Sequence, residues 1–164
     1  MADPAIQTVS LDALTIVGLP VSGGWQDLPK VVPEAWRRLF AESDAIADAS
    51  RSVGSHVGVS LAMEDGIYRE FVGQVVSGCR KAPAGMSLLH IPANTYRHLL
   101  HTGSLKAIAS SFQAIYDDAE EQGLAAGIFK LDFGYQADGS ITHHDLYVGI
   151  DPIAAPETAE NTKD

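Results

Sequence analysis

The sequence has little that would support covalent cross-linking, membrane insertion or nucleic-acid binding. Cys79 is the single cysteine among 164 residues, which excludes an intrachain disulfide and a cysteine-based zinc site. No uninterrupted apolar run approaches the ~18 residues that a membrane helix needs, so we expect no membrane association. Lysine and arginine number 11 against 21 acids, and the net charge of −10 repels phosphate backbones. We therefore expect no direct binding to nucleic acid.

Motifs for secretion, nucleotide binding and metal binding are also missing. The first residues have neither the basic nor the apolar region of a signal peptide, so a cytoplasmic location is predicted. There is no Gly-x-Gly-x-x-Gly motif and no Gly-Lys-Ser/Thr phosphate loop. The histidines lack metal-binding spacing, and the adjacent His143 and His144 point to opposite faces of a predicted strand. We expect neither a cofactor nor a metal ion.

What remains is the composition of a single globular domain. Hydrophobic residues make up 46% of the chain, enough for a substantial core. Alternating and helical apolar patterns predict two rounds of strand, helix and hairpin. The predicted strands span 9–21, 57–61, 67–76, 86–100 (with a bend at Pro92), 128–135 and 144–150. The first predicted helix spans 33–47 with Pro33 at its start, and the second runs from an N-cap at Ser104 to Gly123.

The two halves are similar enough to indicate a duplicated βαββ unit. Asp65-Gly66 matches a turn at Asp138-Gly139, and Phe71–Gly73 matches Tyr147–Gly149, at an offset of roughly 72 to 76 residues. A duplicated unit pairs its halves about a pseudo-twofold axis and leaves a cleft there. We predict an α+β domain over residues 8–152, built from repeats at about 8–78 and 84–152. We expect residues 1–7 to form an N-terminal extension and residues 153–164 a disordered tail.

Strand parity sorts the residues of the last two strands onto faces. Lys130 and Asp132 share one face of the strand at 128–135, and Asp145 and Tyr147 share one face of the closing strand. If the apolar faces pack under the helices, Asp132, Asp145 and Tyr147 lie together on the opposite face. A carboxylate among aromatic rings is the chemistry of a cation site, although an acid on a solvated sheet face fits the spacing equally well.

Six segments, in this order, resemble a known family. They are VPEAWRRLF at 32–40, GVS at 58–60, PAGM at 83–86, IPANTY at 91–96, HTGS at 101–104 and DLYVGI at 145–150. Over about residues 8–152 the chain is similar to the GyrI-like small-molecule-binding domain, the effector-binding module of AraC- and MerR-type regulators, which also occurs alone. The resemblance implies an SHS2-type fold, in which two βαββ units form a curved antiparallel sheet with two helices and a central cleft. Aromatic residues line that cleft around a buried acid, and it takes up amphipathic, often cationic, small molecules.

The resemblance also implies which residues line the cleft. Asp132 stands where the family usually has glutamate, and Tyr147 stands at the tyrosine of the last strand. Core packing would explain Trp36 and Phe71 equally well, and Glu70 fits either a solvated edge or an alternative acid. The predicted ligand-binding residues are Trp36, Phe71, Tyr96, Asp132, Asp145 and Tyr147.

The function predicted from this site is that of a stand-alone small-molecule-binding or sensing protein. We expect no helix-turn-helix segment in this chain, so we expect any effect on transcription to need a protein partner. A second hypothesis is a hydrolase of reactive, cyclopropane-bearing small molecules, with Asp132 as a raised-pKa acid or base. A third is a modulator of a protein partner, as in gyrase inhibitor-like proteins.

Overall fold

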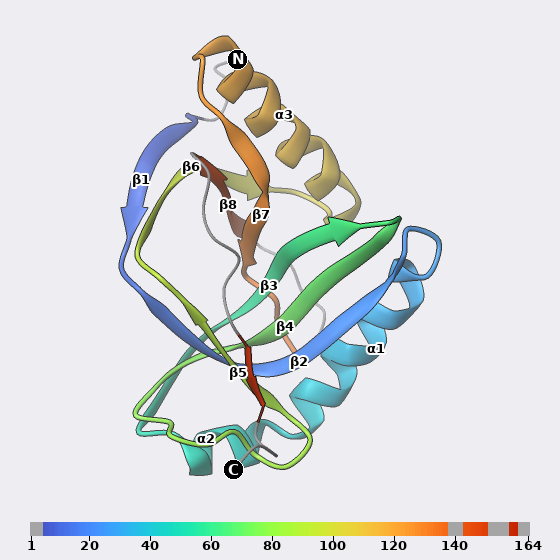
Figure 1. Cartoon of the computed structure of the whole chain (residues 1–164), viewed down its shortest axis with the longest axis vertical. Helices are drawn as coiled ribbons and strands as arrows, with labels where there is room; N and C mark the ends of the chain where they lie inside the picture. The colour runs from blue at the N-terminus through green and yellow to red at the C-terminus, as the bar shows by residue number, and fades with distance from the viewer. Residues whose placement is uncertain (1–4, 138–142, 151–157, 161–164) are drawn as a thin grey trace.

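Nine strands and three α-helices account for most of the chain (Figure 1). The structure is a computed structural model, and it describes residues 5–137, 143–150 and 158–160. The strands are β1 (Gln7–Leu11), β2 (Leu14–Gly24), β3 (Ser52–Glu64), β4 (Ile67–Ser77), β5 (Ser87–Ile91), β6 (Asn94–Thr102), β7 (Ala126–Phe133), β8 (His143–Ile150) and β9 (Thr158–Glu160). The helices are α1 (Leu28–Ala41), α2 (Ser43–Ala49) and α3 (Ile108–Glu121), with a 3-10 turn at Leu105–Ala107.

The strand order shows the predicted duplication directly. The sheet runs β1-β6-β8-β7-β3-β4-β2-β5-β9, and the neighbouring strands are antiparallel. β2-α1-β3-β4 and β6-α3-β7-β8 are the two βαββ units, and they meet where β3 pairs with β7. The α+β fold with duplicated βαββ units in one curved sheet is therefore confirmed.

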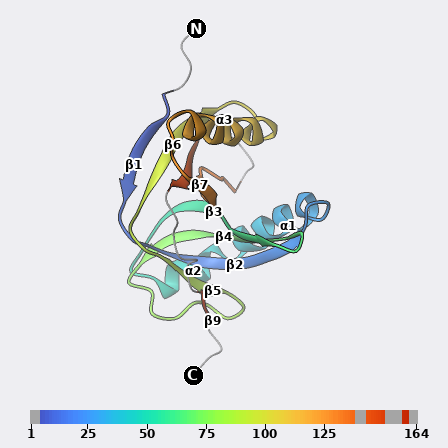
Figure 2. The ribbon, with the colours of Figure 1, turned by 45° about the horizontal axis from the view of Figure 1, so that its top comes forward.

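Both long helices cover the same face of the sheet, whereas a second core fills its other face. α1 packs on a cluster that includes Val17 and Val72, and α3 packs on Leu146 and Val148. The opposite face buries a separate cluster centred on Phe71 and other apolar side chains of six strands. Figure 2 shows the sheet curling, with α3 over one half and α1 beside the other. Both faces of the central strands are consequently buried.

Two boundaries differ from the sequence prediction because of prolines. α1 begins at Leu28 rather than Pro33, with Pro29 in its first turn and Pro33 inside the helix. The first turn has N–H groups without intrahelical acceptors, so Pro29 costs nothing there. The segment predicted as one strand over 86–100 is two strands. Pro92 separates β5, which pairs with β2 of the first repeat, from β6, which pairs with β8 of the second.

The C-terminal predictions fall largely outside the described residues. This applies to the turn at Asp138-Gly139, to the last two residues of the predicted domain (151–152) and to residues 153–157 and 161–164 of the expected tail. Within that tail, Thr158–Glu160 forms β9 and pairs with Ser87–Leu89 of β5. In the part of the chain that the structure describes, no helix combines the length and apolarity needed to span a membrane.

Candidate ligand-binding site

Two rows of side chains cross the sheet at the junction of the repeats and face the helices. Cross-strand pairing sets both rows. The first row contains Val72, Gly58, Asp132 and Leu146, and the second contains Glu70, Ser60, Lys130 and Val148. Because alternate residues of a strand share a face, the rows are about 7 Å apart. The residues between the two rows point to the other face and contribute to the opposite core: Phe71, Val59, Leu131 and Tyr147.

A cavity of about 900 Å³ lies over these two rows, between α1 and α3. α1 presents Pro33, Trp36 and Phe40 to it, at the spacing of one helical face. The 3-10 turn and α3 contribute Leu105, Ile108, Ala109 and Phe112. Its floor is formed by β3, β4 and β7, so each repeat supplies one helix and part of the sheet. Its volume is in the range that small-molecule sites occupy.

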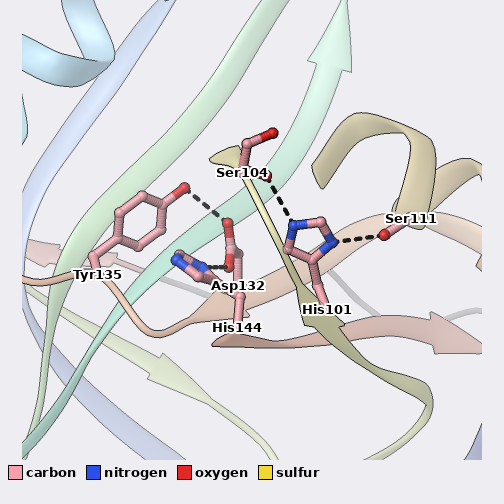
Figure 3. Close-up of polar contacts among 6 residues, drawn as sticks. All are labelled: His101, Ser104, Ser111, Asp132, Tyr135 and His144. Atoms are coloured by element: carbon pink, nitrogen blue, oxygen red, sulfur yellow. Dashed lines mark hydrogen bonds and ion pairs between the residues drawn. The ribbon is translucent and has the colours of Figure 1, made fainter. Parts of the chain in front are cut away.

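The Asp132 carboxylate lies in the floor of the cavity and is held by two donors (Figure 3). Tyr135 Oη donates to Asp132 Oδ2 at 2.7 Å, and His144 Nδ1 donates to Asp132 Oδ1 at 2.6 Å. Asp132 is only 7% exposed and His144 is fully buried. A carboxylate has about four lone-pair sites, so two remain for a ligand. The two hydrogen bonds fix the orientation of the carboxylate and leave each of its oxygens able to accept another hydrogen bond.

The Tyr135 side chain can reach Asp132 because the backbone turns sharply at Gly134, the first residue after β7. Gly134 has a φ of +133°, and a Cβ there would lie 2.7 Å from the His143 carbonyl oxygen. Other residues rarely adopt this backbone conformation. Burial, followed by the Asp132 charge, raises the pKa of Tyr135 well above its ordinary value. The hydroxyl therefore stays protonated and remains a donor.

An aromatic wall stands beside the carboxylate. The ring of Tyr135 stacks on Trp36, with centroids 4.4 Å apart, and Trp36 stacks on Phe40 at 5.4 Å. Gly58 beneath them has no side chain, and a Cβ there would already touch Tyr135 at 3.4 Å. His56 packs on Phe40, and its burial lowers the pKa of the imidazole. The wall is thus a stack of aromatic rings, and His56 packs against it as a largely neutral imidazole.

The second row carries a different set of polar groups. Ser60 Oγ donates to Glu70 Oε1 at 3.0 Å. Lys130 Nζ lies over two rings of α3, 5.6 Å from the centroid of Phe112 and 5.9 Å from that of Tyr116. Desolvation raises the pKa of Glu70 and lowers that of Lys130, while their mutual attraction opposes both shifts.

A buried histidine fixes the entry to α3. His101 Nε2 donates to the Ser104 carbonyl at 2.9 Å, and Ser111 Oγ lies 2.7 Å from His101 Nδ1 (Figure 3). The imidazole therefore joins β6 to the start of the helix that forms one side of the cavity.

Across residues 5–137, 143–150 and 158–160, no three histidine, cysteine, aspartate or glutamate side chains group closely enough to hold a metal ion.

The structure brings only some of the predicted ligand-binding residues together. Trp36 and Asp132 face the cavity. Phe71 borders it, but its side chain is fully buried in the opposite core. Tyr96 and Tyr147 pack on that opposite face too, in edge-to-face contact with each other.

The assignment of faces was wrong for β7. Asp132 pairs with Leu146, so Asp145 and Tyr147 point away from it, and Asp145 instead accepts a hydrogen bond from His98 Nε2 at 2.8 Å. The apolar face of β7 packs against the second core rather than under the helices. Parity cannot identify the helix-facing side when the curled sheet buries both sides.

Three residues of the site, Tyr135, His144 and Lys130, were not assigned to it from sequence. Tyr135 and His144 hold Asp132, and Lys130 lies in the second row beside Glu70, which was predicted only as an alternative acid. A histidine on the apolar face of β8 was a usable signal, because a buried imidazole needs a partner. The pairing of Ser60 with Glu70 could not be counted from the hairpin turn at Asp65-Gly66, because the register shifts between Ser60 and Ala62.

Comparison with known proteins agrees with this architecture. Residues 7–150 match the family model Cass2, described as "Integron-associated effector binding protein". The fold and its central cavity define a small-molecule effector-binding domain. The chain belongs to the Cass2 family of integron-associated effector-binding proteins. No curated protein sequence matches the chain.

Solved structures show the same fold at low sequence identity. The structure of SAV2435 bound to tetraphenylphosphonium is 13% identical, with a TM-score of 0.68, and the match covers 90% of this chain and 94% of that one. The C-terminal domain of EcmrR is 10% identical, with a TM-score of 0.65, covering 92% and 99%. An integron cassette protein from Vibrio cholerae is 8% identical, with a TM-score of 0.63, covering 89% and 95%.

Proposed function

We propose that this protein binds an amphipathic, cationic small molecule in the cavity between α1 and α3, with Asp132 as the counter-charge. The observation that carries the proposal is the Asp132 carboxylate in the floor of a cavity walled by Trp36 and Tyr135. Ring faces attract a cation through their quadrupole, and the carboxylate adds a full charge. The bound structure of SAV2435 shows that a similar fold takes up such a cation.

The surroundings of Asp132 favour binding over a purely structural role. A buried carboxylate costs free energy unless it is paired, and its two hydrogen bonds come from a phenol and an imidazole rather than from arginine or lysine. No lysine or arginine in the described part of the chain forms an ion pair with it. The carboxylate is therefore held in place by two neighbours, and no lysine or arginine competes with a cationic ligand for it.

The test compares two probes of equal size and opposite charge, tetraphenylphosphonium and tetraphenylborate. The wild type should bind the phosphonium and discriminate against the borate. Asp132→Asn keeps the shape and a hydrogen-bonding partner for Tyr135 and His144, so it should fold but lose this preference. Equal binding of both ions by the wild type, or an unchanged preference in the folded variant, would overturn the proposal. Thermal shift gives a first readout, because a ligand at 100 times its Kd adds about 2.7 kcal/mol.

A second candidate, hydrolysis of a reactive small molecule, rests on two carboxylates in one cavity. Glu70, with its raised pKa, suits a general acid, and the hydrogen-bonded Asp132 suits an ionised partner. Mass spectrometry of a cyclopropane-bearing compound after incubation with the protein separates the two functions. A binding protein returns the compound unchanged. Turnover that Glu70→Gln and Asp132→Asn each abolish would establish the hydrolase.

A further inference from the structure

The four charged residues that line the cavity balance one another. Glu70 and Asp132 are acidic, and Arg37 and Lys130 are basic. A simple lipophilic cation satisfies Asp132, but it gives no hydrogen bond to the ammonium of Lys130, which Glu70 attracts without forming an ion pair. The charge pattern of the cavity is therefore not that of a site for a cation alone.

Lys130 has an unusual position for a lysine. It lies on the same face of β7 as Asp132, two residues away, and its ammonium sits over the rings of Phe112 and Tyr116. Among the described residues, no carboxylate lies within ion-pairing distance of it. The ring contacts hold the aliphatic stem and the charge at the cavity wall, but rings accept no strong hydrogen bond.

Glu70, the neighbouring acid, does not give Lys130 the hydrogen-bonding partner that a ligand could supply. Glu70 is engaged by Ser60, and burial raises its pKa, so its charge is held less firmly than that of an exposed glutamate. An anionic group in the cavity would give Lys130 the charge-assisted hydrogen bonds that it lacks. A protonated Glu70 would be a second donor to the same group.

From this arrangement we infer that the second row is an anion-recognising subsite, and that the preferred ligand is an amphipathic zwitterion. Its cationic aromatic part lies at Asp132, Trp36 and Tyr135, and its carboxylate or similar acceptor lies at Lys130. Lys130 and Asp132 are alternate residues on one face of β7, with backbone positions about 7 Å apart, so one small ligand can reach both side chains. This inference rests on the proposed function, because it assumes that the same cavity binds the cationic part.

The test uses a matched pair of dyes. Rhodamine 110 carries a cationic xanthylium and a free carboxylate, and rhodamine 123 is its methyl ester, a cation without the negative group. Fluorescence anisotropy gives the Kd of each for the full chain. The wild type should bind rhodamine 110 about tenfold or more tightly than rhodamine 123, since a charge-assisted hydrogen bond is worth that much.

Lys130→Met keeps the length of the side chain and removes its charge. It should abolish the preference for rhodamine 110 while binding tetraphenylphosphonium at least as tightly as the wild type does. Lys81→Met, which changes an exposed lysine away from the cavity, should keep the wild-type preference. Circular dichroism establishes that both variants are folded.

The outcomes separate this inference from the proposed function. A wild type that binds the ester as well as the acid, or a Lys130→Met variant that retains the preference, overturns the zwitterion subsite and leaves cation binding intact. If neither the dyes nor tetraphenylphosphonium bind, the proposed function itself fails.

Discussion

Removing the hydroxyl of Tyr135 tests whether the Asp132 network is built as described. Tyr135→Phe keeps the ring that stacks on Trp36 and deletes only the donor to the carboxylate. A hydrogen bond to a charged group contributes about 1.5–3 kcal/mol. In a domain of this size, that corresponds to a melting temperature lowered by about 3–12 °C.

The matched control is Tyr116→Phe. Tyr116 Oη donates to the Gly127 carbonyl at 2.7 Å, so this variant deletes a neutral and more exposed hydrogen bond, worth about 0.5–1.5 kcal/mol. Urea unfolding of both variants gives the comparison. The reasoning is refuted if Tyr135→Phe is no more destabilising than Tyr116→Phe.

Two further measurements sharpen this prediction. A double-mutant cycle between Tyr135→Phe and Asp132→Asn should give a coupling energy of about 0.5–3 kcal/mol, whereas additive effects would mean that the two groups do not interact. The pKa of Tyr135 is raised on folding, so its contribution is complete below the ordinary tyrosine pKa and is lost only as the pH rises through the raised value. The effect of Tyr135→Phe should therefore be constant between about pH 6 and about pH 9.

Two other substitutions test the backbone and the second acid. Gly134→Ala should destabilise the protein by about 1–3 kcal/mol in urea unfolding, because its φ is +133° and its Cβ would meet the His143 carbonyl. Gly127→Ala, which has open space around the new Cβ, should stay within about 0.5 kcal/mol of wild type, and equal effects would argue against this account of the turn. Glu70→Gln should raise the melting temperature at neutral pH, since burial raises the pKa of Glu70 and disfavours its ionised form. That gain should shrink as the pH falls through the raised pKa of Glu70 and should vanish below the ordinary glutamate pKa of 4.5, and a gain independent of pH would contradict the assignment.

The fold could be predicted from sequence because its signals are local and repeated. Hairpin turns such as Asp65-Gly66 and the apolar stripe of α3 specify each element, and their recurrence specifies the duplication. The boundary of α1 could not be predicted, because Pro33 looks like a helix start and Pro29 occupies that role. Either proline fits the sequence rule.

The site could be predicted only in part, because it depends on registers between strands far apart in the chain. Asp132 and Trp36 were predicted at the cleft and line the cavity, but the pairing of Asp132 with Leu146 decides that Tyr147 faces the other way. Tyr135 was missed because the chain turns at Gly134, which brings Tyr135 back over the strand that it has just left. No local pattern contains that information.

The most direct test of the central claim is a crystal structure of the protein with tetraphenylphosphonium. We predict that the phosphonium lies between α1 and α3, with a phenyl ring against Trp36 and the charge within about 6 Å of the Asp132 carboxylate. A cation bound instead on the opposite face, beside Tyr96, Asp145 and Tyr147, would contradict the assignment of the site.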